Sequence, residues 1–248
     1  MIISTKPTTI HTARTLMTAE LAQVMDHTDS NKNFALAIEH NVAGKRTQAN
    51  RQRSYIALRK LYRFDTAYLP FAALFYFWKL TEPQFRPKLA FLYALGHDYL
   101  LSESFSVITN TPLGASLSVT QFQSSLANHH PNQFSEVTQY SIAKNLASSY
   151  KQVGYLVGKV KAMRIPFQST LPVVTFAFLM AYINGDRGEY LLGSIWVKAL
   201  EQDADTLHHF LVQASHKGWL TYQRAGSVMS ISFESLIQEI TAGNGHQD

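Results

Sequence analysis

Two long apolar runs constrain the fold of this 248-residue chain more than any other feature. Residues 69–78 are nearly all apolar, and residues 171–183 are apolar apart from Pro172 and Thr175. Neither run reaches the roughly 20 residues that a membrane-spanning helix requires. Because such runs are unfavourable in water, we expect buried core helices over residues 69–80 and 171–183, in a cytoplasmic protein without membrane contact.

The composition agrees with a folded protein that has a sizeable core. Hydrophobic residues make up 46% of the chain and charged residues 16%, which excludes wholesale disorder. The chain contains no cysteine. This excludes disulfides, thiolate metal sites and cysteine nucleophiles.

Turn and capping residues divide the first half of the chain into short helices. We expect these helices at residues 15–27, 30–40, 47–62, 69–80 and 88–101. The segment Thr-Asn-Thr-Pro-Leu-Gly at residues 109–114 has the composition of a linker. We therefore predict an N-terminal helical domain at residues 1–112 and a C-terminal domain at residues 113–248.

The second half of the chain repeats one order of elements, which is helix, helix and then a short β-hairpin. The first set is expected at residues 118–128, 137–153 and 154–163, and the second at residues 189–202, 203–217 and 219–233. This order is typical of winged helix-turn-helix modules. We therefore predict a mainly α fold, a helical bundle with two winged-helix-like units that carry small β-hairpins.

Positive charge is concentrated in two tracts that contain no acidic residue. Residues 44–64 hold seven of the 22 basic residues, and residues 137–185 hold five. Residues 186–248, by contrast, hold four basic and eight acidic residues. Because phosphates attract Lys and Arg, both tracts predict contacts with duplex DNA. The acidic segment is expected to bind a protein partner instead.

The expected DNA contacts lie on one helix in the first tract and on a helix and a hairpin in the second. Arg46, Arg53 and Lys60 are spaced by seven residues, so they share one helix face. Asn and Arg side chains can also pair with base edges. The expected DNA-binding residues are Lys45, Arg46, Asn50, Arg51, Arg53, Arg59, Lys60, Arg63, Lys144, Asn145, Lys151, Lys159, Lys161 and Arg164.

No compact motif in the sequence indicates catalysis. The chain has no P-loop, no Gly-x-Gly-x-x-Gly, no His-Glu-x-x-His and no Gly-x-Ser-x-Gly. Asp205 and His209 stand one helical turn apart, but a metal site needs three or four converging ligands. We interpret them as surface residues, and we expect no catalytic residue, no metal and no cofactor.

Two segments resemble the BrxA family of BREX phage-resistance systems. One is Gly-Lys-Arg-Thr-Gln-Ala-Asn-Arg-Gln-Arg at residues 44–53, which leads into the basic helix. The other is Ser-Ile-Ala-Lys-Asn-Leu-Ala-Ser-Ser-Tyr-Lys-Gln-Val-Gly-Tyr-Leu at residues 141–156. The resemblance spans residues 15–165. It implies a mostly helical, non-enzymatic DNA-binding protein that works with other proteins of an antiviral defence system.

Three alternatives remain open at this point. A transcription regulator would make the same DNA contacts, and a protein-binding scaffold would dock the basic helix on an acidic partner. RNA is an alternative ligand, since phosphates dominate binding to either nucleic acid. Binding to a defined operator would favour the regulator, whereas sequence-indifferent binding would favour the accessory role in defence.

Overall fold

The computed structural model describes residues 8–28, 33–159, 161–226 and 228–243. Within these ranges the chain is mainly α-helical and carries two small antiparallel sheets, one of three strands and one of two. The prediction of a mainly α fold is therefore confirmed. The expected helix start at Ser30, the hairpin residue Val160 and the hairpin residue Ser227 lie outside the described residues.

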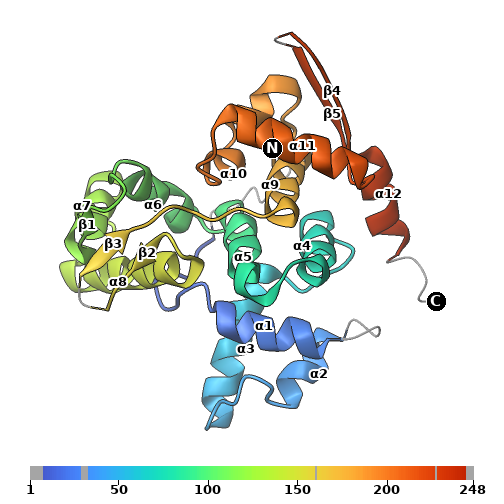
Figure 1. The fold of residues 1–248 in the computed structure, drawn as a ribbon. Helices are drawn as coiled ribbons and strands as arrows, with labels where there is room; N and C mark the ends of the chain where they lie inside the picture. Colours follow the sequence, from blue (N-terminus) through green and yellow to red (C-terminus); the bar gives the residue numbers. More distant parts are fainter. Residues whose placement is uncertain (1–7, 29–32, 160, 227, 244–248) are drawn as a thin grey trace. The chain divides into compact units, whose positions relative to one another are not determined.

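The chain forms two compact units, and each combines segments that are distant in the sequence (Figure 1). The described part of unit 1 comprises residues 64–93 and 168–243, and that of unit 2 comprises residues 8–63 and 94–167. The predicted boundary between residues 112 and 113 is wrong, because it lies inside unit 2.

The segment that we predicted to be a linker is a turn within unit 2. It connects α6 (Tyr99–Thr109) to β1 (Ser116–Leu117). The N–H of Gly114 donates a hydrogen bond to the carbonyl of Arg164 at 2.8 Å, and the N–H of Arg164 donates to the carbonyl of Ala115 at 3.0 Å. These bonds hold the turn against a strand, so its Thr, Asn, Pro and Gly residues do not separate two domains.

Unit 1 is built around one fully buried helix. Helix α9 (Leu171–Asn184) packs against α4 (Leu69–Leu80), α10 (Ile195–Lys198) and α11 (Ala204–His216). Both apolar runs form the core helices that we predicted, α4 and α9. Within the described ranges, no helix combines the length and the apolar character needed to cross a membrane.

The remaining elements of unit 1 surround these helices. They are 3₁₀ turns at Pro83–Phe85 and Gly188–Gly193, most of α5 (Arg86–Leu95), the antiparallel hairpin of β4 (Thr221–Ala225) and β5 (Val228–Ser232), and α12 (Glu234–Ala242). The indole N–H of Trp196 donates to the carbonyl of Leu92 at 2.9 Å and so joins the two sequence segments of the unit.

Unit 2 combines helices with the three-stranded sheet. Its elements are α1 (Thr18–His27), α2 (Phe34–Glu39), α3 (Gln48–Tyr62), α6, β1, α7 (Val119–His129), α8 (Glu136–Val153), β2 (Leu156–Val157) and β3 (Ala162–Arg164). The strand order is β1–β3–β2, so β3 pairs with both neighbours. Figure 1 shows the strands beside the α7–α8 pair, and β2 packs against α8.

Local capping explains where the helices of unit 2 begin and end. The Ser135 hydroxyl accepts the N–H of Thr138 at 3.3 Å before α8, and Gly154 ends that helix with a left-handed φ of 86°. The predicted helix at residues 88–101 is two helices, α5 and α6, because the Asp98 carboxylate caps α6 by accepting the N–H of Leu101. The predicted helix at residues 189–202 is reduced to a 3₁₀ turn and α10.

Candidate nucleic-acid interface

The division into units separates charge more sharply than the linear sequence does. The sequence segments of unit 2 hold fifteen basic and seven acidic residues, a net charge of +8. Those of unit 1 hold seven basic and ten acidic residues, a net charge of −3. Both basic tracts lie in unit 2, apart from the uncharged end of the second tract after residue 167. An anionic ligand is therefore attracted mainly to unit 2.

Helix α3 presents most of the first basic tract to solvent. The Thr47 hydroxyl caps the helix by accepting the N–H of Asn50 at 3.2 Å. Arg53 and Lys60 are exposed on α3, and Arg46 is exposed just before its N-cap, so Arg46 does not share a helix face with the other two. Further exposed side chains with hydrogen-bonding or basic groups are Asn50, Arg59 and Arg63.

The opposite face of α3 anchors the helix in unit 2. Leu58, Leu61 and Tyr62 are buried, and the Tyr62 hydroxyl donates to the carbonyl of Leu16 at 2.8 Å. Burial raises the pKa of Tyr62 well above its ordinary value, with smaller contributions from the negative charges of Asp98 and Glu20. The basic face is consequently fixed in direction by packing on its other side.

Two residues of the first tract that we predicted to contact DNA have partners within the protein, so they are not free to bind phosphates as predicted. Lys45 is half-buried, and its Nζ lies 2.7 Å from Oε1 of Glu20 on α1. Arg51 is also half-buried, and its guanidinium donates to the carbonyl of Glu39 at 3.3 Å. Both side chains therefore help to hold α3 against α1 and α2.

The second tract contributes fewer exposed charges from α8 than we predicted. Lys144 is exposed and lies with its Nζ 5.6 Å from the ring centroid of Tyr140. Asn145 is half-buried, and its carboxamide donates to the carbonyl of His11 at 2.9 Å, so this group has a protein partner. Lys151 is half-buried, and its Nζ donates to the carbonyl of Lys159 at 3.4 Å.

The connection between β2 and β3 places two lysines in solvent. Lys159 and Lys161 are both exposed. Gly158 makes this tight connection possible, since its φ is +107° and a Cβ at this position would lie 2.3 Å from the carbonyl oxygen of Lys161. The backbone therefore requires glycine beside the two exposed lysines.

Arg164 is the clearest correction among the predicted DNA contacts. Its side chain is 2% exposed. The guanidinium donates to the carbonyls of Ile108, at 3.4 Å, and of Tyr155, at 3.3 Å, and also to the carbonyl of Ile165. It stacks 4.9 Å from the ring centroid of Tyr155. Arg164 is thus a core residue of unit 2 and is inaccessible to a phosphate.

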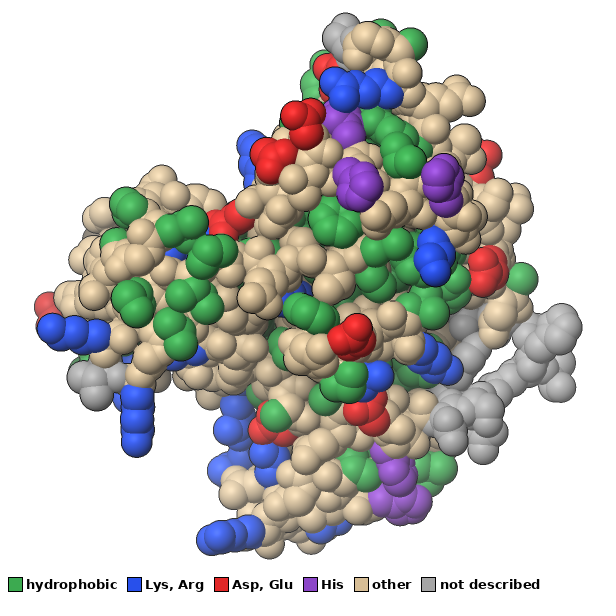
Figure 2. Space-filling view, in the orientation of Figure 1, with side chains coloured by type: hydrophobic (Ala, Val, Ile, Leu, Met, Phe, Trp, Pro, Cys, Tyr) green, Lys and Arg blue, Asp and Glu red, His purple; other side chains and the backbone are tan. Residues whose placement is uncertain are grey.

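Lys and Arg side chains lie on both sides of one hollow of unit 2. Figure 2 shows this hollow between the part that carries β2 and β3 and the part that carries α3. A polyanion in this position would contact charges from both tracts at once. The geometry therefore favours a rod-like anionic ligand over a single phosphate group.

Unit 2 also contains a Ser–His–Asp arrangement that no sequence motif revealed. Nδ1 of His11 lies 2.8 Å from Oδ2 of Asp98, and Nε2 of His11 lies 2.9 Å from Oγ of Ser149. Burial alone would raise the pKa of Asp98, but attraction to His11 and hydrogen bonds from His11, Ile10 and Leu101 outweigh it and lower that pKa. In the sequence, His11 lies 87 positions from Asp98 and 138 positions from Ser149. No local spacing pattern could therefore indicate this arrangement.

This arrangement holds the fold together and does not present a nucleophile. His11 and Ser149 are both 0% exposed and Asp98 is 1% exposed. The Ser149 hydroxyl oxygen accepts the N–H of Leu16 at 3.0 Å and lies 3.0 Å from the carbonyl of Asn145. A catalytic serine needs access to a substrate carbonyl, and Ser149 has no such access. The network instead joins the N-terminal segment to α6 and α8.

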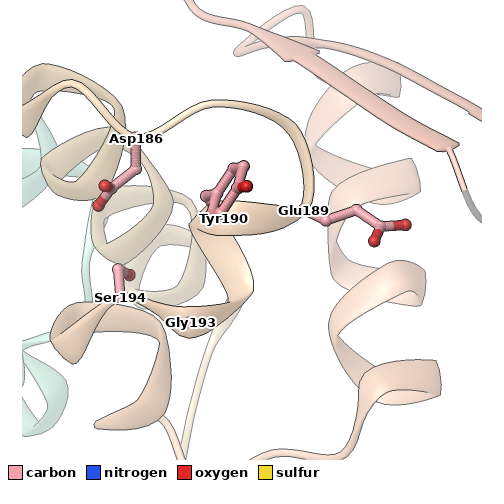
Figure 3. A pocket seen from close by; sticks show the side chains of 5 residues that line it. All are labelled: Asp186, Glu189, Tyr190, Gly193 and Ser194. Carbon is pink, nitrogen blue, oxygen red and sulfur yellow. The ribbon is translucent and has the colours of Figure 1, made fainter.

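In unit 1, an open cavity of about 640 Å³ lies beside the Gly188–Gly193 turn and is lined by Asp186, Glu189, Tyr190, Gly193 and Ser194. Figure 3 shows the carboxylates of Asp186 and Glu189 on either side of Tyr190 and pointing away from each other. Two diverging carboxylates cannot share one cation or one proton. Throughout the described ranges, no three His, Asp or Glu side chains come close enough to hold a metal ion.

The pair Asp205 and His209, weighed above as two metal ligands, lies on the exposed side of α11. Nε2 of His209 lies 2.8 Å from Nε2 of Gln213. The neighbouring His208 contacts the Tyr222 hydroxyl through Nδ1 at 2.5 Å, and burial together with the charge of Arg224 lowers the pKa of His208. These histidines therefore have contacts on α11 and β4.

Comparison of the chain with protein-family models, with curated proteins and with solved structures gave no match in any of the three. The resemblance to the BrxA family therefore stays a prediction.

Proposed function

We propose that unit 2 binds double-stranded DNA and that the chain is a non-enzymatic accessory protein of a BREX-like phage-defence system. The observation that carries the proposal is the exposed basic surface of unit 2. Arg46, Arg53, Lys60, Lys159 and Lys161 are all exposed in a unit with net charge +8. Figure 2 shows Lys and Arg side chains on both sides of one hollow of this unit. Duplex DNA offers phosphates along both of its strands, so it matches two separated sets of charges.

The topology of unit 2 supports the same proposal. The element order α6, β1, α7, α8, β2, β3 with strand order β1–β3–β2 supports our proposal that this part of unit 2 is a winged helix-turn-helix module. In such a module, α7 and α8 are the helix-turn-helix pair and α8 is the recognition helix. The β2–β3 connection then takes the position of the wing, and Lys159 and Lys161 contact the phosphate backbone.

A salt series on the full chain tests the proposal directly. The logarithm of the affinity for a duplex should fall linearly with the logarithm of the salt concentration, by about 0.9 per phosphate contact. Replacing Arg46, Arg53 and Lys60 with Ala should flatten this slope by up to about 2.7, and replacing Lys159 and Lys161 should flatten it by up to about 1.8.

The matched control removes three exposed charges from unit 1, by replacing Lys79, Lys198 and Lys217 with Ala. This variant loses the same net charge as the α3 variant but should keep the wild-type slope. Equal slopes for the α3 variant and the wild type would refute DNA binding by α3. A protein that binds no duplex at low salt would refute the proposed function as a whole.

A transcription regulator is the second candidate, favoured by the helix-turn-helix order of α7 and α8. The two roles share the DNA contacts and differ in where the protein binds. Footprinting on the promoter of its own gene separates them, since protection of a defined operator there favours the regulator.

A further inference from the structure

Helix α8 carries a solvent-facing stripe whose composition does not suit contact with phosphates alone. Val137 is 82% exposed and Tyr140 is 51% exposed. Ser141 and Lys144 are also exposed, and the four positions follow the i, i+3, i+4, i+7 spacing of one helix face. The opposite face of α8 is buried through residues such as Ile142 and Leu146. The stripe therefore points outward while the helix stays anchored.

The stripe occupies the N-terminal half of α8. Glu136, one turn before Tyr140, borders the stripe on one side and is the acidic residue of α8. The next positions along the same face, Ser148 and Lys151, are half-buried, and Lys151 donates to the carbonyl of Lys159. Only the N-terminal half of α8 is consequently free to enter a groove.

Two side chains of the stripe are arranged in advance of binding. The Nζ of Lys144 lies 5.6 Å from the ring centroid of Tyr140, one turn away. This cation–π contact restricts the lysine to the stripe, so less conformational freedom is lost when it binds.

We propose that Val137, Tyr140, Ser141 and Lys144 contact base edges in the major groove and give the protein a DNA sequence preference. This inference rests on the proposed function, in which α8 is the recognition helix. The N-terminal residues of that helix are the ones that reach base edges in helix-turn-helix proteins. The net charge of +8 on unit 2 favours an anionic ligand, and duplex DNA is the anionic ligand of the proposed function.

The chemistry of the four side chains specifies which bases they recognise. Valine methyl groups pack against the C5-methyl group of thymine, and lysine donates to O6 and N7 of guanine. Serine accepts or donates according to the base, and Tyr140 adds apolar contact beside the lysine. The preferred site should therefore contain thymine and guanine in adjacent positions of the major groove.

Selection from a library of random duplexes with the full-length chain is the first step of the test. We expect enrichment of a short core that contains thymine and guanine. The affinity for this preferred duplex divided by the affinity for a scrambled duplex then measures specificity. Val137→Ala and Lys144→Ala should each lower this ratio roughly fivefold or more.

Two control variants separate base reading from general binding. Arg53→Ala should lower both affinities together and leave the ratio unchanged. Val228→Ala, which removes the same atoms from a 69% exposed valine of β5 in unit 1, should change neither affinity. Because Val137, Lys144, Arg53 and Val228 are all exposed, each variant should fold, which circular dichroism checks.

Replacing thymine by uracil at the preferred position tests the methyl contact itself. Loss of the thymine methyl should weaken wild-type binding about fourfold, the equivalent of about 0.8 kcal/mol for one buried methyl-sized group. The same replacement should leave the affinity of Val137→Ala unchanged.

The outcomes distinguish this inference from the proposed function. Salt-dependent binding without any enriched sequence, or an unchanged ratio for both α8 variants, would overturn base reading by the stripe and leave DNA binding intact. If the stripe binds a protein instead, the specificity ratio should be unchanged for both α8 variants. Absence of duplex binding by the wild-type chain would overturn both proposals.

Discussion

Replacing Asp98 with Asn is expected to destabilise unit 2 strongly, although the two side chains have the same shape. Oδ1 of Asp98 accepts from the Thr9 hydroxyl at 2.9 Å and from the N–H of Leu101 at 3.1 Å. Oδ2 accepts from the N–H of Ile10 and from Nδ1 of His11, both at 2.8 Å. An asparagine oxygen can replace Oδ1. Its amide nitrogen would face two donors in place of Oδ2.

The magnitude follows from the two hydrogen bonds that this replacement removes. Hydrogen bonds to a charged group contribute about 1.5–3 kcal/mol each. Two such bonds predict a loss of about 3–6 kcal/mol in the free energy of unfolding of unit 2. The loss is large because Asp98 is 1% exposed and water cannot replace the missing acceptor.

Hydrogen exchange read by mass spectrometry is the suitable assay. All three tryptophans, Trp78, Trp196 and Trp219, belong to unit 1, so their fluorescence reports that unit. Peptides from α6 and α8 report unit 2, and their protection measures its opening free energy. Asp98→Asn should speed their exchange while tryptophan fluorescence in urea changes little.

Asp203→Asn is the matched control, since Asp203 also caps a helix, α11, by accepting the N–H of Thr206 at 2.8 Å. Asp203 is exposed and Asn caps helices about as well as Asp, so this variant should be far less destabilised than Asp98→Asn. Protection of α6 and α8 in Asp98→Asn within about 1 kcal/mol of wild type would refute the argument, because the network would then not depend on the carboxylate.

Three further predictions concern unit 2. Because the folded pKa of Asp98 is lowered, its stabilising contribution is complete above the ordinary pKa of 3.8 and is lost as the pH falls through the lower folded value. Acidification through this range should therefore speed hydrogen exchange of α6 and α8 in the wild type, whereas Asp98→Asn, which lacks the carboxylate, should lose less protection over the same range. An identical loss of protection in both proteins would contradict this. Arg164→Ala should destabilise unit 2 by at least about 3 kcal/mol, because the hydrogen bonds of a buried guanidinium to three carbonyls and its contact with the Tyr155 ring are lost. A folded sample in the cold should nevertheless keep the wild-type salt slope for DNA, and a flatter slope would restore Arg164 as a phosphate contact. Gly158→Ala should disrupt the β2–β3 connection and weaken DNA binding. The control Gly114→Ala should cost only about 1–2 kcal/mol of strain, because Gly114 has a φ of +80° but no atom lies within 4 Å of an added Cβ. Equal hydrogen-exchange rates for β2 and β3 in both variants would show that the close approach to Lys161 is unimportant.

The sequence alone determined the features that depend on neighbouring residues. The apolar runs identified the core helices α4 and α9, since runs of that length and composition must be buried. The helix expected at residues 137–153 agrees with α8, whose ends are set locally by the caps Ser135 and Gly154. Arg53 and Lys60 lie seven residues apart and are both exposed on α3, because helix geometry fixes which positions share a side, whereas Arg46 precedes the N-cap Thr47 and lies outside the helix.

Other features depended on residues that are distant in the chain. The two units interleave, since residues 64–93 join residues 168–243, and no local composition marks such a division. Arg164, Asn145 and Lys45 have the residue types of DNA contacts, but tertiary carbonyl or carboxylate partners engage them instead.

Burial is the physical reason for this difference between local and distant features. A basic or polar side chain has the same sequence signature whether it meets solvent or a buried carbonyl, and only the packed chain decides which partner it finds. His11, Asp98 and Ser149 show the same dependence, because they meet only when the N-terminal segment, α6 and α8 pack together. Helix faces and caps follow from local geometry, whereas partners follow from the tertiary fold.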